Sequence, residues 1–162
     1  MDSFEATHPG SIVALEGLNE VTCSRSATMA ARASAAAGQF QQAYYTAIKG
    51  DASLANIPVY DLTLGYNDLS GYSQLGNLSA STDVVNSHAY ASTEITPQAA
   101  LAASLSAAGS VASGKPVVIT ETGYTTQSNT PFLGADQSVQ AKSILNTLVD
   151  AYKEGRQHHL SL

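Results

Sequence analysis

The stretch Val117-Val118-Ile119-Thr120-Glu121 carries the clearest strand signal in the chain, and it ends in a carboxylate. Its unbroken run of β-branched residues is typical of a parallel strand that is buried on both faces. Outward from it, three more apolar segments are expected to be strands, at residues 11–15, 57–62 and 83–88. Segments with helical periodicity lie between most of these strands. The order β-α-β-β-α-β-α predicts an α/β fold with a parallel sheet and right-handed crossovers.

Three helices are predicted from their apolar stripes and their end signals. The first should end at Gly50. The second should begin with Thr96 as its N-cap and Pro97 in its first turn, and end at Gly114. The third should cover about residues 136–154 and stop at Gly155. The residues expected to face inward are Phe40, Ala43, Tyr44, Ala47 and Ile48 in the first helix, Leu101, Leu105, Ala108 and Ala112 in the second, and Ala141, Leu145, Leu148 and Tyr152 in the third.

The composition excludes several classes of protein. The 162 residues include 7 basic and 13 acidic side chains, a formal charge of −6, without a basic cluster, so no nucleic-acid partner is expected. No apolar stretch approaches the roughly 18 residues that span a bilayer, so no membrane partner is expected either. The single cysteine, Cys23, excludes a disulfide framework. The first residues, Met1 and Asp2 among them, lack the pattern of a signal peptide.

Two glutamates stand out because each directly follows a predicted strand. Glu20 comes shortly after the first strand, and Glu121 ends the last one. Parallel α/β sheets place their active sites at the carboxyl ends of the strands. The sequence between the two glutamates has room for three βα units of roughly 30 or more residues each. In a closed barrel, these two side chains would therefore face each other across the mouth.

Three short motifs follow three of the predicted strands in order. They are Asn19-Glu20, His88-Ala89-Tyr90 and Thr120-Glu121-Thr122-Gly123-Tyr124. Together they resemble the clan A glycoside hydrolases, which are (β/α)₈ barrels with one catalytic glutamate after strand 4 and another after strand 7. The resemblance covers about residues 11–155. It implies a partial TIM barrel in which the parallel strands are strands 4 to 7, with flanking helices.

The resemblance also implies a function and a set of site residues. Glu20 would be the general acid/base and Glu121 the nucleophile in retaining hydrolysis of β-linked glycosides through a covalent glycosyl-enzyme intermediate. Such a reaction needs two carboxyl groups about 5–5.5 Å apart. The partner would be a carbohydrate substrate, and neither a cofactor nor a metal is expected. The implied substrate-binding residues are Asn19, which would hold the sugar 2-hydroxyl, Tyr90, which would hydrogen-bond Glu121, and His88 and Tyr124.

Several of these residues also have a purely structural interpretation. A glutamate can simply complement the dipole at a helix N-terminus, and His88 alone could be a buried, hydrogen-bonded histidine. Glu16 shares strand parity with Glu20 and is expected to be a hydrogen-bond partner or to bind a structural ion. Asp61 could line the cleft or cap a turn.

The remaining aromatic and metal-binding side chains allow weaker predictions. Tyr66, Tyr72 and Tyr124 could stack on sugar faces or be half-buried loop aromatics. A metal site formed by Cys23 with His158 and His159 is not expected, because the ligand spacing is missing.

A complete barrel of this type takes about 250 residues. The chain is therefore expected to be one incomplete barrel domain, residues 1–162, without strands 1–3 and 8. Residues 22–35 and 156–162 are atypical, and shifting plausible codons by one base makes residues 22–33 and 156–162 more family-like, which suggests frameshifts. The full-length protein would be secreted or extracytoplasmic.

A four-strand arc would leave two unpaired edges and an uncovered apolar interior, so self-association through the sheet edges is predicted. Catalysis would be impaired in such a chain. The alternative function is that of a non-catalytic barrel fragment, either a pseudoenzyme or a carbohydrate-binding segment.

Overall fold

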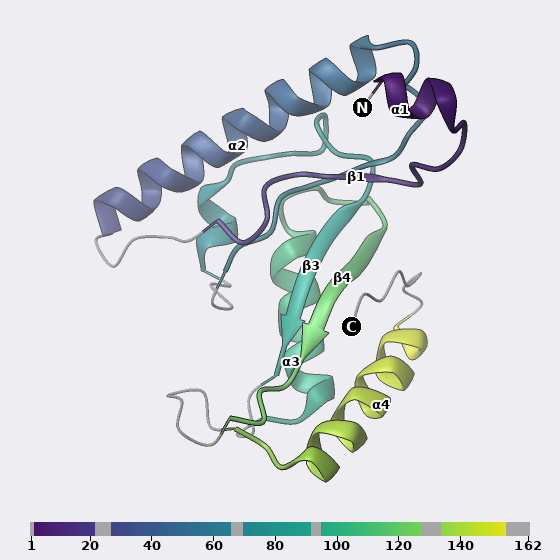
Figure 1. Ribbon diagram of the computed structural model, residues 1–162. Helices are drawn as coiled ribbons and strands as arrows, with labels where there is room; N and C mark the ends of the chain where they lie inside the picture. The colour runs from purple at the N-terminus through teal and green to yellow at the C-terminus, as the bar shows by residue number, and fades with distance from the viewer. Residues whose placement is uncertain (1, 22–26, 66–69, 92–94, 128–133, 155–162) are drawn as a thin grey trace.

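The computed structural model describes residues 2–21, 27–65, 70–91, 95–127 and 134–154. Its elements alternate as predicted, with one additional helix at the start and a 3₁₀ helix after the second strand (Figure 1). In chain order they are α1 (Asp2–Thr7), β1 (Leu15–Glu16), α2 (Ala27–Gly50), β2 (Val59–Tyr60), η1 (Gly71–Gln74), β3 (Val85–Tyr90), α3 (Pro97–Gly109), β4 (Val117–Gly123) and α4 (Gln137–Lys153). The chain is thus an α/β protein.

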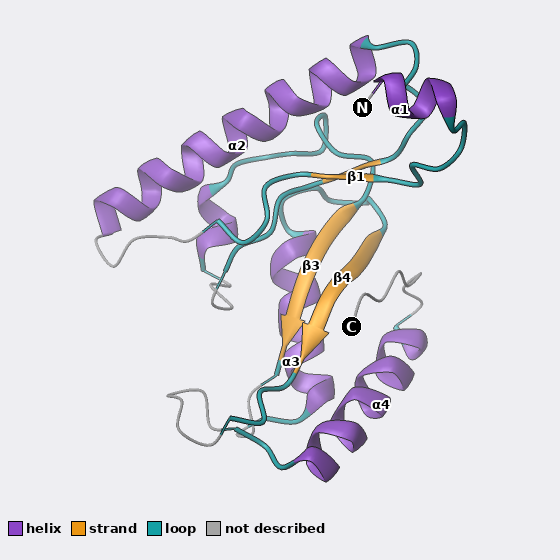
Figure 2. Cartoon of the chain, in the orientation of Figure 1, coloured by secondary structure: helices purple, strands orange, loops and turns teal. Residues whose placement is uncertain are grey.

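Both strand pairs among the described residues are parallel, as predicted (Figure 2). β1 pairs with β2, β3 pairs with β4, and an isolated bridge between Tyr60 and Val84 links β2 to the start of β3. The strands therefore follow one another in space in their sequence order. Within the described ranges no other strand pairs with the outer edges of β1 and β4, and self-association through these edges stays a prediction.

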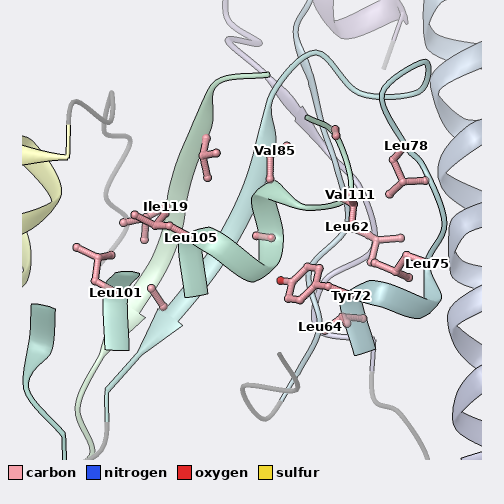
Figure 3. Close-up of a cluster of buried hydrophobic side chains, with 14 of the residues drawn as sticks. Leu62, Leu64, Tyr72, Leu75, Leu78, Val85, Leu101, Leu105, Val111 and Ile119 are labelled. Carbon is pink, nitrogen blue, oxygen red and sulfur yellow. The ribbon is translucent and has the colours of Figure 1, made fainter. Parts of the chain in front are cut away.

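The main core extends from the contact between α3 and the β3–β4 pair to Leu62 and Leu64 after β2 and to Tyr72, Leu75 and Leu78 in and after η1 (Figure 3). Val85 and Ile119 are fully buried there against Leu101 and Leu105 of α3, as the predicted apolar stripe requires. The predicted start of α3 is confirmed, because the Thr96 hydroxyl accepts the N–H of Ala99. The predicted end at Gly114 is wrong: α3 ends at Gly109, and Gly114, with φ 82°, lies in the following turn.

The predicted inward face of α2 is wrong in part, because a polar residue occupies its centre. Phe40, Ala43 and Ala47 are exposed, whereas Gln41 is fully buried. The Gln41 amide nitrogen donates to the carbonyls of Tyr60 and Ser81, at 3.3 and 3.1 Å, whereas its Oε1 has no hydrogen-bond partner among the described residues. A hydrophobic pattern cannot reveal a helix face that is fixed by a buried amide.

The predicted inward face of α4 is also largely wrong. Leu145 and Tyr152 are 62% and 79% exposed, and Ala141 is exposed as well. Thr147 and Ala151 are buried instead, on the side that packs against α3. The predicted apolar stripe contains Ala141, Leu145 and Tyr152, which are exposed. Helical periodicity alone therefore could not identify the side of α4 that packs against α3.

Some predictions fall on parts of the chain that the structure does not describe. These include Cys23, Tyr66, Gly155, His158, His159 and residues 156–162. Of the atypical residues 22–35, those from Ala27 onward belong to α2. No helix among the described residues combines the length and the apolar character needed to cross a membrane.

Candidate active site

The polar side chains of β3 and β4 face the same side because of an irregularity in their pairing. Asn86 pairs with Val118, but His88 pairs with Glu121, so β4 has one extra residue between the two pairs. This bulge brings both Thr120 and Glu121 next to the side chains of β3, which simple alternation would not allow. Bulges of this kind commonly re-aim a side chain beside an active site.

Glu20 lies in a strained turn that interrupts the pairing of β1. Its φ is 45°, a left-handed conformation that costs a non-glycine residue about 1 kcal/mol or more. The turn is held because the Glu20 N–H donates to the Thr63 hydroxyl at 3.0 Å, and Leu18 and Val21 on either side bond to the Thr63 backbone. Residues held in such conformations cluster at functional sites.

Glu20, His88 and Glu121 converge at the carboxyl ends of three strands. His88 Nδ1 lies 3.2 Å from Glu20 Oε1 and 3.5 Å from Glu121 Oε2. One oxygen of each glutamate and one ring nitrogen lie within 4.8 Å of one another. The two glutamates therefore do meet at one rim of the strands, although 100 residues of chain separate them.

Tyr90 holds Glu121 in place from the end of β3. Its hydroxyl donates to Glu121 Oε1. Burial, together with the hydrogen bond and the charge of Glu121, raises the pKa of Tyr90. The phenol therefore stays a donor across the physiological pH range.

His88 is enclosed by carboxylates on both ring nitrogens. Besides the two contacts of Nδ1, its Nε2 lies 3.6 Å from Glu16 Oε1, and the side chain is only 3% exposed. Burial opposes protonation, but the contacts with Glu16 and Glu20 and the charge of Glu121 outweigh it and raise the pKa of His88. The contact with His88 in turn lowers the pKa of Glu16.

The floor of the site is polar, which corrects the predicted apolar interior. Glu16 Oε1 accepts from the Asn86 amide, confirming its predicted role as a hydrogen-bond partner. The Thr120 hydroxyl lies 2.7 Å from Asn86 Oδ1 and 3.2 Å from Glu16 Oε1, and can donate to either. Asn86 and Thr120 were not predicted as site residues. The alternation of β3 with His88 would have revealed Asn86, but no sequence signal marks the bulge that brings in Thr120.

Asp61 fits neither of its predicted roles. It is fully buried, so it does not line an open cleft, and its Oδ1 accepts the backbone N–H of Asn86 rather than capping a turn. Burial raises the pKa of Asp61 to about 8. Its other oxygen, Oδ2, has no hydrogen-bond partner among the described residues.

The other predicted site residues are not joined to this cluster. Asn19 is exposed beside Glu20, and within the described part of the chain no hydrogen bond links it or Tyr124 to the cluster. Tyr124 is half-buried, and its carbonyl accepts from Gln140. Tyr72 is 5% exposed in the core, so both of its predicted roles are wrong. Although glutamate and histidine can bind metals, Glu20, His88 and Glu121 contact one another, and His88 and Glu121 also contact Glu16 and Tyr90, so we assign no metal to them.

The comparisons with known proteins concern the fold. No protein-family model matches the sequence, and no curated protein does. The crystal structure of a glycoside hydrolase family 17 β-1,3-glucanosyltransferase from Rhizomucor miehei is similar, with a TM-score of 0.56 and 17% sequence identity. The similarity covers 76% of this chain and 46% of that enzyme, so the chain spans less than half of its length. The chain is therefore similar in fold to part of this family 17 glycoside hydrolase, in line with the resemblance to clan A.

Proposed function

We propose that the chain carries the catalytic residues of a retaining β-glycoside hydrolase, with Glu121 as the nucleophile and Glu20 as the general acid/base. The observation that carries this proposal is the approach of their carboxylate oxygens to within 4.8 Å of each other at the ends of two strands. Retaining enzymes hold the pair about 5–5.5 Å apart, whereas inverting enzymes need about 6.5–9.5 Å to admit a water molecule. The spacing favours retention.

In the proposed reaction each of the two glutamates acts in both steps. A Glu121 oxygen attacks the anomeric carbon and forms an ester, while Glu20 gives its proton to the glycosidic oxygen as that C–O bond breaks. Glu20 then takes a proton from water, whose oxygen attacks the anomeric carbon and releases Glu121. The Tyr90 hydroxyl donates a hydrogen bond to Glu121 Oε1 and so fixes the direction of this carboxylate. Asn19, His88 and Tyr124 are the proposed sugar-binding residues.

The proposed substrate is a β-linked carbohydrate, and the family 17 neighbour makes a β-1,3-linked glucan the first polysaccharide to test. We propose slow turnover, because four strands provide only part of the wall that encloses a sugar in a complete barrel. The low charged fraction of 12% is compatible with a secreted or extracytoplasmic protein.

Trapping of the intermediate tests the proposal even if turnover is slow. The purified chain is incubated with 2-deoxy-2-fluoro-β-glycosyl fluorides of glucose, galactose, mannose and xylose, and then digested for mass spectrometry. We expect one label, on the peptide that contains Glu121, and none in Glu121→Gln. Glu154→Gln, which removes an exposed carboxylate, should label like the unmodified chain.

The same assignment predicts the behaviour of Glu121→Ala on aryl β-glycosides. Loss of the nucleophile should lower turnover by about a thousandfold or more, and azide should restore it and yield an α-glycosyl azide. A folded, unmodified chain that neither labels nor releases the aryl group would favour a non-catalytic barrel fragment.

A further inference from the structure

Glu16 is the least expected member of the cluster, because it lies below the rim on which Glu20 and Glu121 meet. It belongs to β1, yet it contacts side chains of β3 and β4. Its Oε1 accepts from the Asn86 amide, lies 3.2 Å from the Thr120 hydroxyl and lies 3.6 Å from His88 Nε2. One carboxylate oxygen thus ties three strands together directly beneath the imidazole.

The surroundings of His88 determine which form of the ring fits. A neutral imidazole has one donor and one acceptor nitrogen. In this site Nδ1 faces Glu20 and Glu121, while Nε2 faces Glu16, so an acceptor lone pair on either nitrogen would point at a carboxylate. At 3% exposure the ring has little access to water that could relieve this repulsion. As long as Glu16, Glu20 and Glu121 are ionised, only the imidazolium offers an N–H to each of them.

We infer that Glu16, supported by Asn86 and Thr120, is a positioning residue that holds His88 as an imidazolium with its Nδ1–H aimed between Glu20 and Glu121. The positioning role of Glu16 in catalysis rests on the proposed glycoside hydrolysis. The protonation state assigned to His88 does not depend on that function. When both upper glutamates are ionised, the charge on the ring offsets part of the repulsion between them. Its fixed orientation keeps one donor available to both of them.

The titratable groups around His88 come from three elements. Glu16 and Glu20 lie on and just after β1, Glu121 lies on β4, and the Tyr90 hydroxyl reaches the site from β3 through Glu121. Asp61, on the segment after β2, bonds to the Asn86 backbone and not to the ring. Among the described residues, Glu16 is the one carboxylate that contacts Nε2 of His88. Loss of Glu16 should therefore free Nε2 and favour the neutral ring.

The protonation state can be measured directly by long-range ¹H–¹⁵N NMR of the histidine rings in the full chain, titrated from about pH 5 to pH 9 around the ordinary histidine value of about 6.5. The His88 signals are assigned by their loss in His88→Gln. We expect His88 of the unmodified chain to titrate above the ordinary value. In Glu16→Gln the midpoint should fall by about one pH unit, and in Glu16→Asp it should fall less, because a carboxylate remains.

The matched control is Asp83→Asn, which removes a partly buried carboxylate at the opposite ends of the strands and should leave the His88 midpoint unchanged. A neutral His88 in the unmodified chain at pH 7 would overturn the inference without any variant. An unchanged midpoint in folded Glu16→Gln would overturn it as well.

A second measurement separates this inference from the proposed function. If the fluoro-sugar labels Glu121, its labelling rate should depend on pH differently in Glu16→Gln, and an identical pH profile would overturn the positioning role. If no label forms while the His88 midpoint still responds to Glu16, the hydrolase proposal fails and the state assigned to His88 stands.

Discussion

The carboxylates at the two ends of the parallel strands differ in how their charges are compensated. At the amino ends, Asp83 accepts hydrogen bonds from the Tyr45 hydroxyl and the Val59 N–H, both at 2.9 Å, and pairs with Lys49 at 2.8 Å. Lys49 also donates to the carbonyls of Ala55 and Ile57. Burial opposes ionisation, but these partners outweigh it and lower the pKa of Asp83. The charges of Asp83 and Lys49 therefore compensate each other.

At the carboxyl ends three glutamates share one imidazole. Glu16, Glu20 and Glu121 all contact His88, and Glu20 has a strained backbone in addition. Excess charge of one sign and backbone strain both cost stability, and both occur at the end where we propose the active site. The amino ends thus carry a paired ion network, and the carboxyl ends carry the proposed catalytic residues.

The largest expected effect on stability is at the compensated end. Asp83→Ala should lower the free energy of unfolding by about 2–3 kcal/mol, because it leaves Lys49, the Tyr45 hydroxyl and the Val59 N–H without their acceptor. Urea unfolding followed by circular dichroism measures this. Glu154→Ala, on the exposed end of α4, should change stability by less than about 0.5 kcal/mol. A loss at Asp83 no larger than this control would mean that the network contributes nothing.

Substitution of Asp61, which lies between the two strand ends, is expected to have a smaller effect on the free energy of unfolding, and to raise it rather than lower it. Its folded pKa of about 8 lies above the ordinary 3.8, so the folded protein binds a proton that the unfolded chain has released. The stability from Asp61 is therefore present at low pH and is lost as the pH rises from about 4 to about 8. Asp61→Asn imitates the protonated form and should raise the free energy of unfolding at pH 8 by about 1–2 kcal/mol.

The pH dependence of the difference between Asp61→Asn and the unmodified chain isolates this group from the others. The difference should be small near pH 4 and grow toward pH 8. A constant difference across this range would mean that Asp61 is ionised in the folded protein.

The smallest effect tests the strain at the reactive end. Glu20→Gly and Glu20→Ala both remove the carboxylate, but only glycine adopts the left-handed conformation without cost. Glu20→Gly should therefore be more stable than Glu20→Ala by about 1 kcal/mol. Equal midpoints of thermal unfolding for the two variants would show that the turn relaxes and that no strain is held there.

Much of the framework could be predicted because local patterns encode it. The alternation of apolar runs gave the element order, and Thr96 and Pro97 gave the start of α3. The positions of Glu20, His88, Tyr90 and Glu121 at or near the carboxyl ends of the predicted strands were enough to expect that they meet. Strand ends of a parallel sheet share one edge, so sequence position alone determined the rim on which these side chains lie.

Only the tertiary structure decided which faces are buried and how the floor of the site is built. The buried Gln41, the exposed Leu145 and the orientation of Thr120 depend on partners far away in the sequence. The bulge in β4 and the positive φ of Glu20 are departures from regular geometry that pairing with a neighbouring strand imposes. Periodicity describes one element at a time, whereas these features arise where several elements must satisfy the same polar groups.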